Sequence, residues 1–114
     1  MIRKGSIYWV SIAGDSSSGG QGNRPCLVIQ NDVLNESRLN TTLVVAITSI
    51  PDFGKLPGNV IVGKGVANMP WQGVINVSQV IAIEKNKVAD KIGTLPEVLM
   101  KQVNEGLKLI MQLE

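Results

Sequence analysis

Residues 23–32 read NRPCLVIQND, and this stretch decides the fold that the sequence predicts. Its apolar part, Cys26 to Ile29, is short and partly β-branched, which is typical of a strand buried on both faces. Pro25 has no backbone donor and suits the first position of a strand. Arg24 therefore stands where a polar, glycine-rich segment meets a rigid strand, a place where functional side chains are often found. Taken alone, an arginine at a strand end is more often a solvated charge.

The composition limits the possible classes of protein. A length of 114 residues with 44% hydrophobic content indicates a single globular domain over residues 1–114. No apolar run approaches the ~20 residues that span a bilayer, and no export signal begins the chain, so no membrane contact is expected. The single cysteine, Cys26, argues against an internal disulfide and predicts a buried side chain in a protein of the reducing cytoplasm.

Charge and the lack of one residue type restrict the chemistry further. The net charge is +2, so a contact with nucleic acid should be local and short. The chain contains no histidine. This excludes a Ser-His-Asp triad, a Cys-His pair and most zinc sites.

Other apolar runs predict further strands on both sides of the opening stretch. They cover residues 6–12, 43–48 and 59–62, and a helical turn is expected near residues 32–35. Residues 73–77 and 79–83 form either two strands or one long bent strand. Residues 13–23 are rich in serine and glycine and predict a flexible loop.

The C-terminal part changes to a helical period. Residues 94–97 read TLPE, a capping box with Thr94 as N-cap and Pro96 in the first turn. Apolar residues follow at helical spacing and should pack against the sheet. They are Leu99, Met100, Val103, Leu107, Ile110 and Met111. Five or six short strands and one terminal helix predict a mainly β (α+β) fold, a small curved barrel with a helix attached.

Several segments together resemble the MazF/PemK (Kid) toxins. They are RP followed by LVI and ND within residues 24–32, KGSIYWV at 4–10, VAITS at 45–49 and KIGTL at 91–95. These segments cover nearly the whole chain, in order and with compatible spacing. The resemblance implies the SH3-like barrel of the CcdB/PemK type, which agrees with the strand pattern.

The resemblance also implies an activity, the metal-independent cleavage of single-stranded RNA by the toxin of a type II toxin–antitoxin pair. The catalytic arginine and threonine of the family match Arg24 and Thr48. In this chemistry the ribose 2′-hydroxyl attacks the adjacent phosphorus and leaves a 2′,3′-cyclic phosphate or 3′-phosphate and a 5′-hydroxyl. A guanidinium can bind two phosphoryl oxygens and a hydroxyl a third, so neither metal nor cofactor is required. Because arginine keeps its proton in proteins, Arg24 is assigned to charge stabilisation and the general base is left unassigned.

Residues beside the matched motifs are candidates for reading RNA bases. They are Gln79, Asn31, Ser49 and Ser78, although the two serines could equally be solvated strand ends. Trp71 could stack on a base, but a loop anchor over the core is the favoured interpretation. Partners implied by the resemblance are a second copy of the chain, in a homodimer, and an antitoxin with a disordered, often acidic tail.

Two departures from the family pattern leave alternatives open. Ser78 stands where family members often carry an acid, and Ile81 where several carry a basic residue. A catalytically weak or inert member that still binds an antitoxin is therefore a second hypothesis. A gyrase poison like CcdB is a third and less favoured one, because the end of this chain, residues 113–114, does not resemble the CcdB signature.

Overall fold

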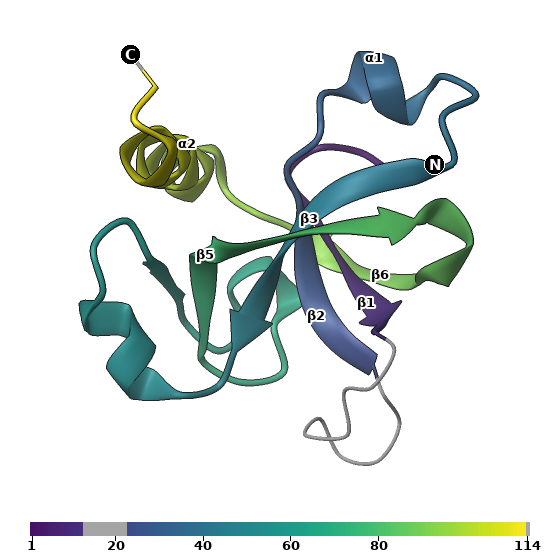
Figure 1. The fold of residues 1–114 in the computed structure, drawn as a ribbon. Coiled ribbons are helices and arrows are strands. Elements are labelled where there is room, and N and C mark those ends of the chain that lie inside the picture. Colours follow the sequence, from purple (N-terminus) through teal and green to yellow (C-terminus); the bar gives the residue numbers. More distant parts are fainter. Residues whose placement is uncertain (13–22, 114) are drawn as a thin grey trace.

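Six antiparallel strands curl into a half-barrel, and one long helix lies against it (Figure 1). The computed structural model describes residues 1–12 and 23–113. The strands are β1 (Ser6–Ser11), β2 (Asn23–Val28), β3 (Thr41–Thr48), β4 (Val60–Val62), β5 (Gly73–Glu84) and β6 (Val88–Thr94), in the sheet order β4-β5-β3-β2-β1-β6. The helices are α1 (Asp32–Asn35) and α2 (Glu97–Met111), with the 3-10 turns η1 (Pro51–Lys55), η2 (Val66–Asn68) and η3 (Lys85–Lys87). The predicted mainly β fold with a C-terminal helix is confirmed.

The central strands are buried on both faces, as their apolar runs predict. Cys26, Leu27 and Val28 of β2 have no solvent exposure. Because successive side chains of a strand point to opposite faces, Leu27 enters the main core while Cys26 and Val28 enter a second core on the other face. The main core fills the space between the sheet and α2, which contributes Val103 and Leu107.

Strand β5 is one long strand interrupted by a bulge. Of the two arrangements expected for residues 73–83, this is the single bent strand. Ile47 of β3 pairs with Ile75 and Val45 pairs with Val80, so Ala46 alone faces residues 76–79 of β5. Extra residues in one strand bend it and aim side chains away from the regular ladder. The bulge lies where polar residues interrupt the apolar pattern.

The two edges of the sheet are bridged by η2, which rests on β6. A Cβ added to Gly93 of β6 would overlap the carbonyl group of Ala67 in η2. Glycine at this position therefore allows the close approach that brings the turn after β4 onto the opposite edge strand.

Two details of the predicted last helix are wrong. Thr94 does not cap α2: it pairs with Ser6 as the last residue of β6, and Pro96 occupies the N-cap position without a side-chain bond. Sheet pairing has taken the residue that the capping box would use. Ile110 and Met111 are 38% and 50% exposed, so the apolar stripe continues past the part of the helix that the sheet covers. Among the described residues, no helix combines the length and the apolar character needed to cross a membrane.

The expected helical turn after β2 is confirmed as α1 and is held at both ends. The backbone N–H of Lys4 donates to Oδ1 of Asp32 at 2.7 Å, and this bond, with one from the Asn35 amide, lowers the pKa of the carboxyl. At the other end, Nζ of Lys85 donates to three carbonyl oxygens. They are those of Leu34, Asn35 and Ser37, at 3.4, 2.9 and 3.1 Å. Of the loop predicted for residues 13–23, residues 13–22 lie outside the described residues, and Asn23 is the first residue of β2.

Candidate active site

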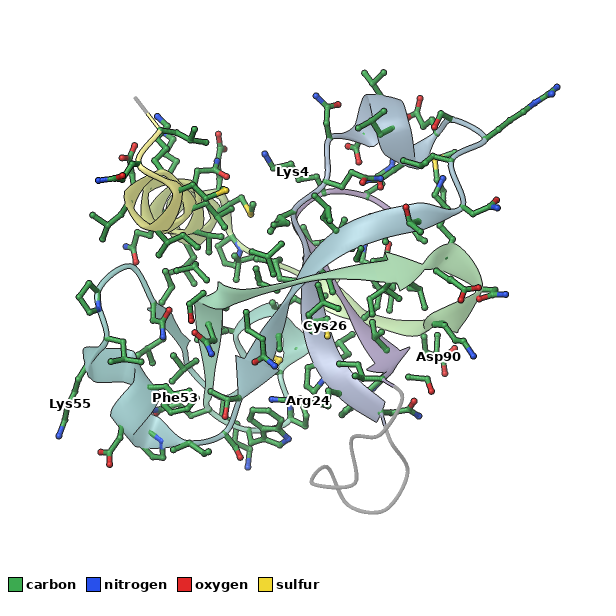
Figure 2. The ribbon with its side chains drawn as sticks, viewed as in Figure 1. Lys4, Arg24, Cys26, Phe53, Lys55 and Asp90 are labelled. Carbon is green, nitrogen blue, oxygen red and sulfur yellow. The ribbon has the colours of Figure 1, made fainter. Side chains whose placement is uncertain are left out.

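A cavity of about 600 Å³ opens at the ends of β2 and β3 where Arg24 and Thr48 are found. Its walls come from β1, β2, β3, η1, the segment before β5 and the β5 bulge. Figure 2 shows Arg24 at the lower end of β2 and Phe53, which also lines the cavity, on the same lower side of the molecule. The described lining residues are Trp9, Asn23, Arg24, Pro25, Ile47, Thr48, Ser49, Ile50, Phe53, Trp71 and Gln79.

Strand pairing brings Arg24 and Thr48 to the same cavity. Strands β2 and β3 pair in the register Cys26 with Ala46 and Leu27 with Val45, and continuing this register places Arg24 opposite Thr48. Side chains directly opposite each other in an antiparallel pair are close neighbours on one face of the sheet. The family-derived candidates, which lie far apart in sequence, therefore line the same cavity.

The two side chains offer different chemistry. Arg24 is half-buried, and it is the one charged residue among the described residues that line the cavity. Thr48 is 5% exposed, and its Oγ1 accepts a hydrogen bond from the backbone N–H of Ile50 at 3.2 Å. That bond uses a lone pair of the hydroxyl oxygen, so the hydroxyl hydrogen is the part that can donate to a ligand. A guanidinium group and a hydroxyl donor that line one cavity can bind an anionic group such as a phosphodiester.

The β5 bulge carries Gln79 to the cavity and is fixed by side-chain amides. Oδ1 of Asn59 accepts from the backbone N–H of Val77 at 3.0 Å. Oδ1 of Asn76 accepts from the Ser78 hydroxyl at 2.8 Å and from the Asn59 amide at 3.3 Å. These bonds satisfy polar groups in the stretch of β5 that lies outside the regular ladder with β3. Gln79 is thus presented by a braced segment of backbone.

Asn59 also contacts η1, which contributes Phe53 to the cavity. Its Nδ2 donates to the carbonyl oxygen of Phe53 in η1 at 3.0 Å. One side chain therefore links η1 to the bulge that carries Gln79. Nothing in the sequence pattern pointed to this residue, which precedes a short strand and resembles any polar turn residue.

The other predicted site residues are distributed between the cavity and elsewhere. Ser49 lines the cavity and is exposed. Ser78 is exposed but does not line it, since its hydroxyl is directed to Asn76. Asn31 lies beyond the far end of β2, where its Oδ1 accepts from the backbone N–H of Val33 at 2.8 Å and caps α1. The structure thus brings four of the six candidates together and leaves Asn31 and Ser78 outside the cavity.

Aromatic side chains are the main feature of the cavity that the sequence interpretation undervalued. Trp9, Phe53 and Trp71 all line it, which is three of the four aromatic residues in the chain. Trp71 packs against the main core, as expected for a loop anchor, and it lines the cavity as well.

Comparison with known proteins identifies the family. The model of the family described as PemK-like, MazF-like toxin of type II toxin-antitoxin system matches residues 3–111. The chain belongs to this toxin family. It is similar to Endoribonuclease MazF6 of Mycobacterium tuberculosis, with 34% identity over 113 residues that cover 99% of each chain. It is also similar to Endoribonuclease EndoA of Bacillus subtilis, with 32% identity over 99% of this chain and 97% of the relative.

Solved structures agree with the family assignment at the level of the fold. An endoribonuclease in complex with its cognate antitoxin from Mycobacterial species superimposes with a TM-score of 0.82 over 100% of this chain and 98% of the other, at 18% identity. The toxin MazF-mt6 of Mycobacterium tuberculosis gives a TM-score of 0.77 over 96% and 98% of the two chains, also at 18% identity. The predicted membership in the MazF/PemK family is confirmed.

The two departures from the usual MazF/PemK pattern now have positions in this toxin. Ser78 takes part in the amide network of the bulge. Ile81 is half-buried and packs against the second core, on the side of the sheet that holds Val44 and Ile83. At position 81, therefore, this toxin uses the side chain for packing.

Proposed function

We propose that this toxin is an endoribonuclease that cleaves single-stranded RNA, mRNA included, at the cavity of Arg24 and Thr48. Its family and its endoribonuclease relatives support the activity, and the observation that carries the site is the convergence of these two side chains from paired strands on one cavity. Cleavage of mRNA would stop translation and growth, and it places the action of the toxin in the cytoplasm.

The proposed reaction is an attack within the RNA itself. The ribose 2′-hydroxyl loses its proton as its oxygen forms a bond to phosphorus. The bond from phosphorus to the 5′-oxygen breaks, and that oxygen takes up a proton, which leaves a 2′,3′-cyclic phosphate and a 5′-hydroxyl. Arg24 binds two phosphoryl oxygens, and the Thr48 hydroxyl donates to another as negative charge grows on the phosphate. Both side chains belong to a rigid pair of strands, so they can hold the phosphate in line for the attack. Gln79 and Ser49 lie beside them to bond base edges.

Primer extension on a long RNA tests this proposal. The wild type, incubated in EDTA, should cut at defined sites, and the new ends should accept phosphate from a polynucleotide kinase without prior phosphatase treatment. Arg24→Ala and Thr48→Ala should each lower the rate by roughly 10²- to 10³-fold, the usual effect of removing one donor to a developing oxyanion. Val98→Ala, at a position 70% exposed on α2, is the matched control and should cut like the wild type.

Two outcomes would contradict the proposal. Intact RNA after long incubation, across RNAs of varied sequence, would favour the inert family member that Ser78 suggested. Unchanged cleavage by Arg24→Ala would refute the assignment of the active site to this cavity.

We also propose that the toxin pairs with itself and binds an antitoxin. Similar structures include an endoribonuclease with its cognate antitoxin and MazE-MazF of Deinococcus radiodurans, which supports a protein partner. Exposed apolar side chains near the end of α2 offer surface for such contacts, among them Leu109 and Met111 at 58% and 50% exposure. Light scattering coupled to size exclusion should give the mass of a dimer, and a monomer at all concentrations would refute self-association.

A further inference from the structure

The chain between β4 and β5 leaves one edge of the sheet, contacts the opposite edge strand β6 and then returns to the sheet. It covers residues 63–72 and contains η2, and we call it the strap. Val66 and Ala67 of the strap pack against the main core, and Met69 is buried within it at 2% exposure. The last part of the strap carries Trp71, which lines the cavity. One segment thus contacts an edge strand and contributes to the wall of the site.

The strap turns on two residues whose backbone conformation disfavours a side chain. Ala67 has a φ of 53° and Asn68 a φ of 59°, both in the left-handed region. Asparagine tolerates this region through its short polar side chain, which alanine lacks. The backbone N–H of Gly65 donates to the carbonyl oxygen of Met69 at 2.9 Å, and the N–H of Met69 donates to that of Val66 at 3.0 Å. A strained conformation persists where the surrounding structure maintains it, and such positions concentrate at functional sites.

Gly93 of β6 forms the surface on which this turn rests. A Cβ at position 93 would overlap the carbonyl group of Ala67, so only glycine allows the contact. Residues 91–95 read KIGTL, a motif of the family resemblance to which the proposed reaction assigns no role. Gly93 is not among the described residues that line the cavity. Its contact with the strap is therefore the structural reason for a glycine in this motif.

The strap reaches the cavity through side chains that meet over Gly73. A Cβ at Gly73 would come within 3.1 Å of Cε of Met69 and within 3.0 Å of Cζ3 of Trp71. It would also overlap Ile47, so all three side chains surround one point. Trp71 and Ile47 line the cavity, and Ile47 is followed in β3 by Thr48, the proposed donor to the phosphate. Packed residues therefore lead without interruption from β6 to the proposed site of cleavage.

We infer that the strap is a positioning element of the active site, and that Gly93 and Met69 are its positioning residues. The contact of η2 with Gly93 places Met69 in the core, and Met69 holds Ile47 and Trp71 at the cavity. Closely packed interiors transmit small displacements. A displacement of about 1 Å at a reacting group can lower a rate by roughly 100-fold. The inference rests on the proposed endoribonuclease function and adds residues that act on Thr48 from outside the cavity.

Two substitutions should disturb the strap in different ways. Gly93→Ala places a methyl group against the carbonyl group of Ala67 and should lift the turn from β6. Met69→Leu roughly conserves the volume of the core side chain but removes its Cε, so it tests the same path if Gly93→Ala folds poorly. Ile83→Val is the control for lost stability. It removes one carbon from the second core, and residue 83 pairs with Thr42 at the end of β3 that lies away from the cavity.

The first measurement is the kinetics of cleavage of a mapped RNA. All proteins are compared at a temperature at which melting curves show each to be folded. Gly93→Ala should lower kcat by roughly 10- to 100-fold and leave KM nearly unchanged, because Arg24 belongs to β2 and not to the strap. Met69→Leu should lower kcat by a smaller factor. Ile83→Val should keep the kcat of the wild type, since a loss of stability alone does not slow a protein that remains folded.

The second measurement shows whether the cavity wall itself moves. Toxin labelled with 5-fluorotryptophan should give two fluorine NMR resonances, because the chain contains two tryptophans, and Trp9→Phe assigns them. Gly93→Ala should shift the Trp71 resonance, although residue 93 is not among the described residues of the cavity. Ile83→Val should leave this resonance in its wild-type position.

Several results would overturn the inference. A folded Gly93→Ala with the kcat of Ile83→Val refutes it, and so does a lower kcat with the Trp71 resonance in its wild-type position. If Gly93→Ala does not fold, an unchanged kcat in Met69→Leu refutes it. Failure of the proposed function is distinguishable, because a wild type that cuts no RNA refutes cleavage while the Trp71 resonance still tests the strap. Mapped cuts by the wild type with no effect of Gly93→Ala refute the strap and leave cleavage standing.

Discussion

Replacing Asn59 with alanine should damage both the stability of the fold and the shape of the cavity. The side chain of Asn59 makes three hydrogen bonds, to the Phe53 carbonyl, to Asn76 and from the backbone N–H of Val77. It therefore connects two walls of the cavity that the sheet does not connect. Alanine removes all three bonds and adds no new partner.

The size of the effect follows from the burial of the groups left behind. Val77 has no solvent exposure, and its backbone N–H loses the Asn59 acceptor, whereas the Asn76 side chain and the Phe53 carbonyl keep their bonds from Ser78 and Leu56. A buried polar group that loses its partner destabilises a protein by about 1–3 kcal/mol, so we expect Asn59→Ala to lower the free energy of unfolding by that amount. For a domain of this size, each kcal/mol lowers the melting temperature by roughly 4 °C. Displacement of the bulge that carries Gln79 should also reduce kcat/KM for RNA by roughly 10- to 100-fold.

Urea unfolding and cleavage of a mapped RNA measure the two effects. Asn86→Ala is the matched control, because Asn86 is an exposed asparagine on η3, outside the bulge and not among the described residues that line the cavity. A double-mutant cycle with Asn76→Ala should show a coupling of about 0.5–3 kcal/mol, as residues of one network do. The reasoning fails if Asn59→Ala unfolds and cleaves like Asn86→Ala. It also fails if the effects of Asn59→Ala and Asn76→Ala on the free energy of unfolding are additive.

Other predictions address the scaffold. Gly106→Ala should lower the free energy of unfolding by about 1–3 kcal/mol, because a Cβ there would overlap the carbonyl oxygen of Gly58. Alanine is the better helix former, so equal or higher stability in urea unfolding would contradict this explanation. The pKa of Asp32 is lowered in the folded state, first by the Lys4 backbone bond, so its contribution is present above the unfolded pKa and is lost as pH falls through the folded pKa. Acid unfolding of Asp32→Asn should accordingly show a weaker pH dependence below about pH 4 than the wild type, and identical profiles would refute the assignment. Lys85→Met removes the cation that binds three carbonyl oxygens around α1 and should speed hydrogen exchange there without changing RNA cleavage.

The sequence predicted best those strands whose burial produces an unbroken run of apolar residues. β2 and β3 are buried on both faces, so their apolar runs were visible without knowledge of the fold. β6 was not recognised as a strand of its own, because this edge strand has an irregular register with β1 and mostly exposed side chains. Thr94 satisfied a helix signal and a strand signal at once, and pairing with Ser6, which is a long-range contact, decided between them.

The candidate site shows where sequence reasoning stops. Arg24 and Thr48 could be named because each stands at the end of a recognisable strand and matches a family position, and the register of β2 and β3 then brings them together. The three aromatic residues of the cavity, Trp9, Phe53 and Trp71, could not be grouped from the sequence, because they come from β1, a 3-10 turn and a loop. The same holds for Asn59, whose three partners lie 6, 17 and 18 residues away. Residues of this kind come together only when the chain folds, so the structure is needed to recognise them as one group. In the proposed mechanism, side chains of β2 and β3 bind the phosphate, whereas Asn59 joins the bulge to η1. Substitutions at Asn59 should therefore change which RNA is bound more than how its phosphate is cleaved.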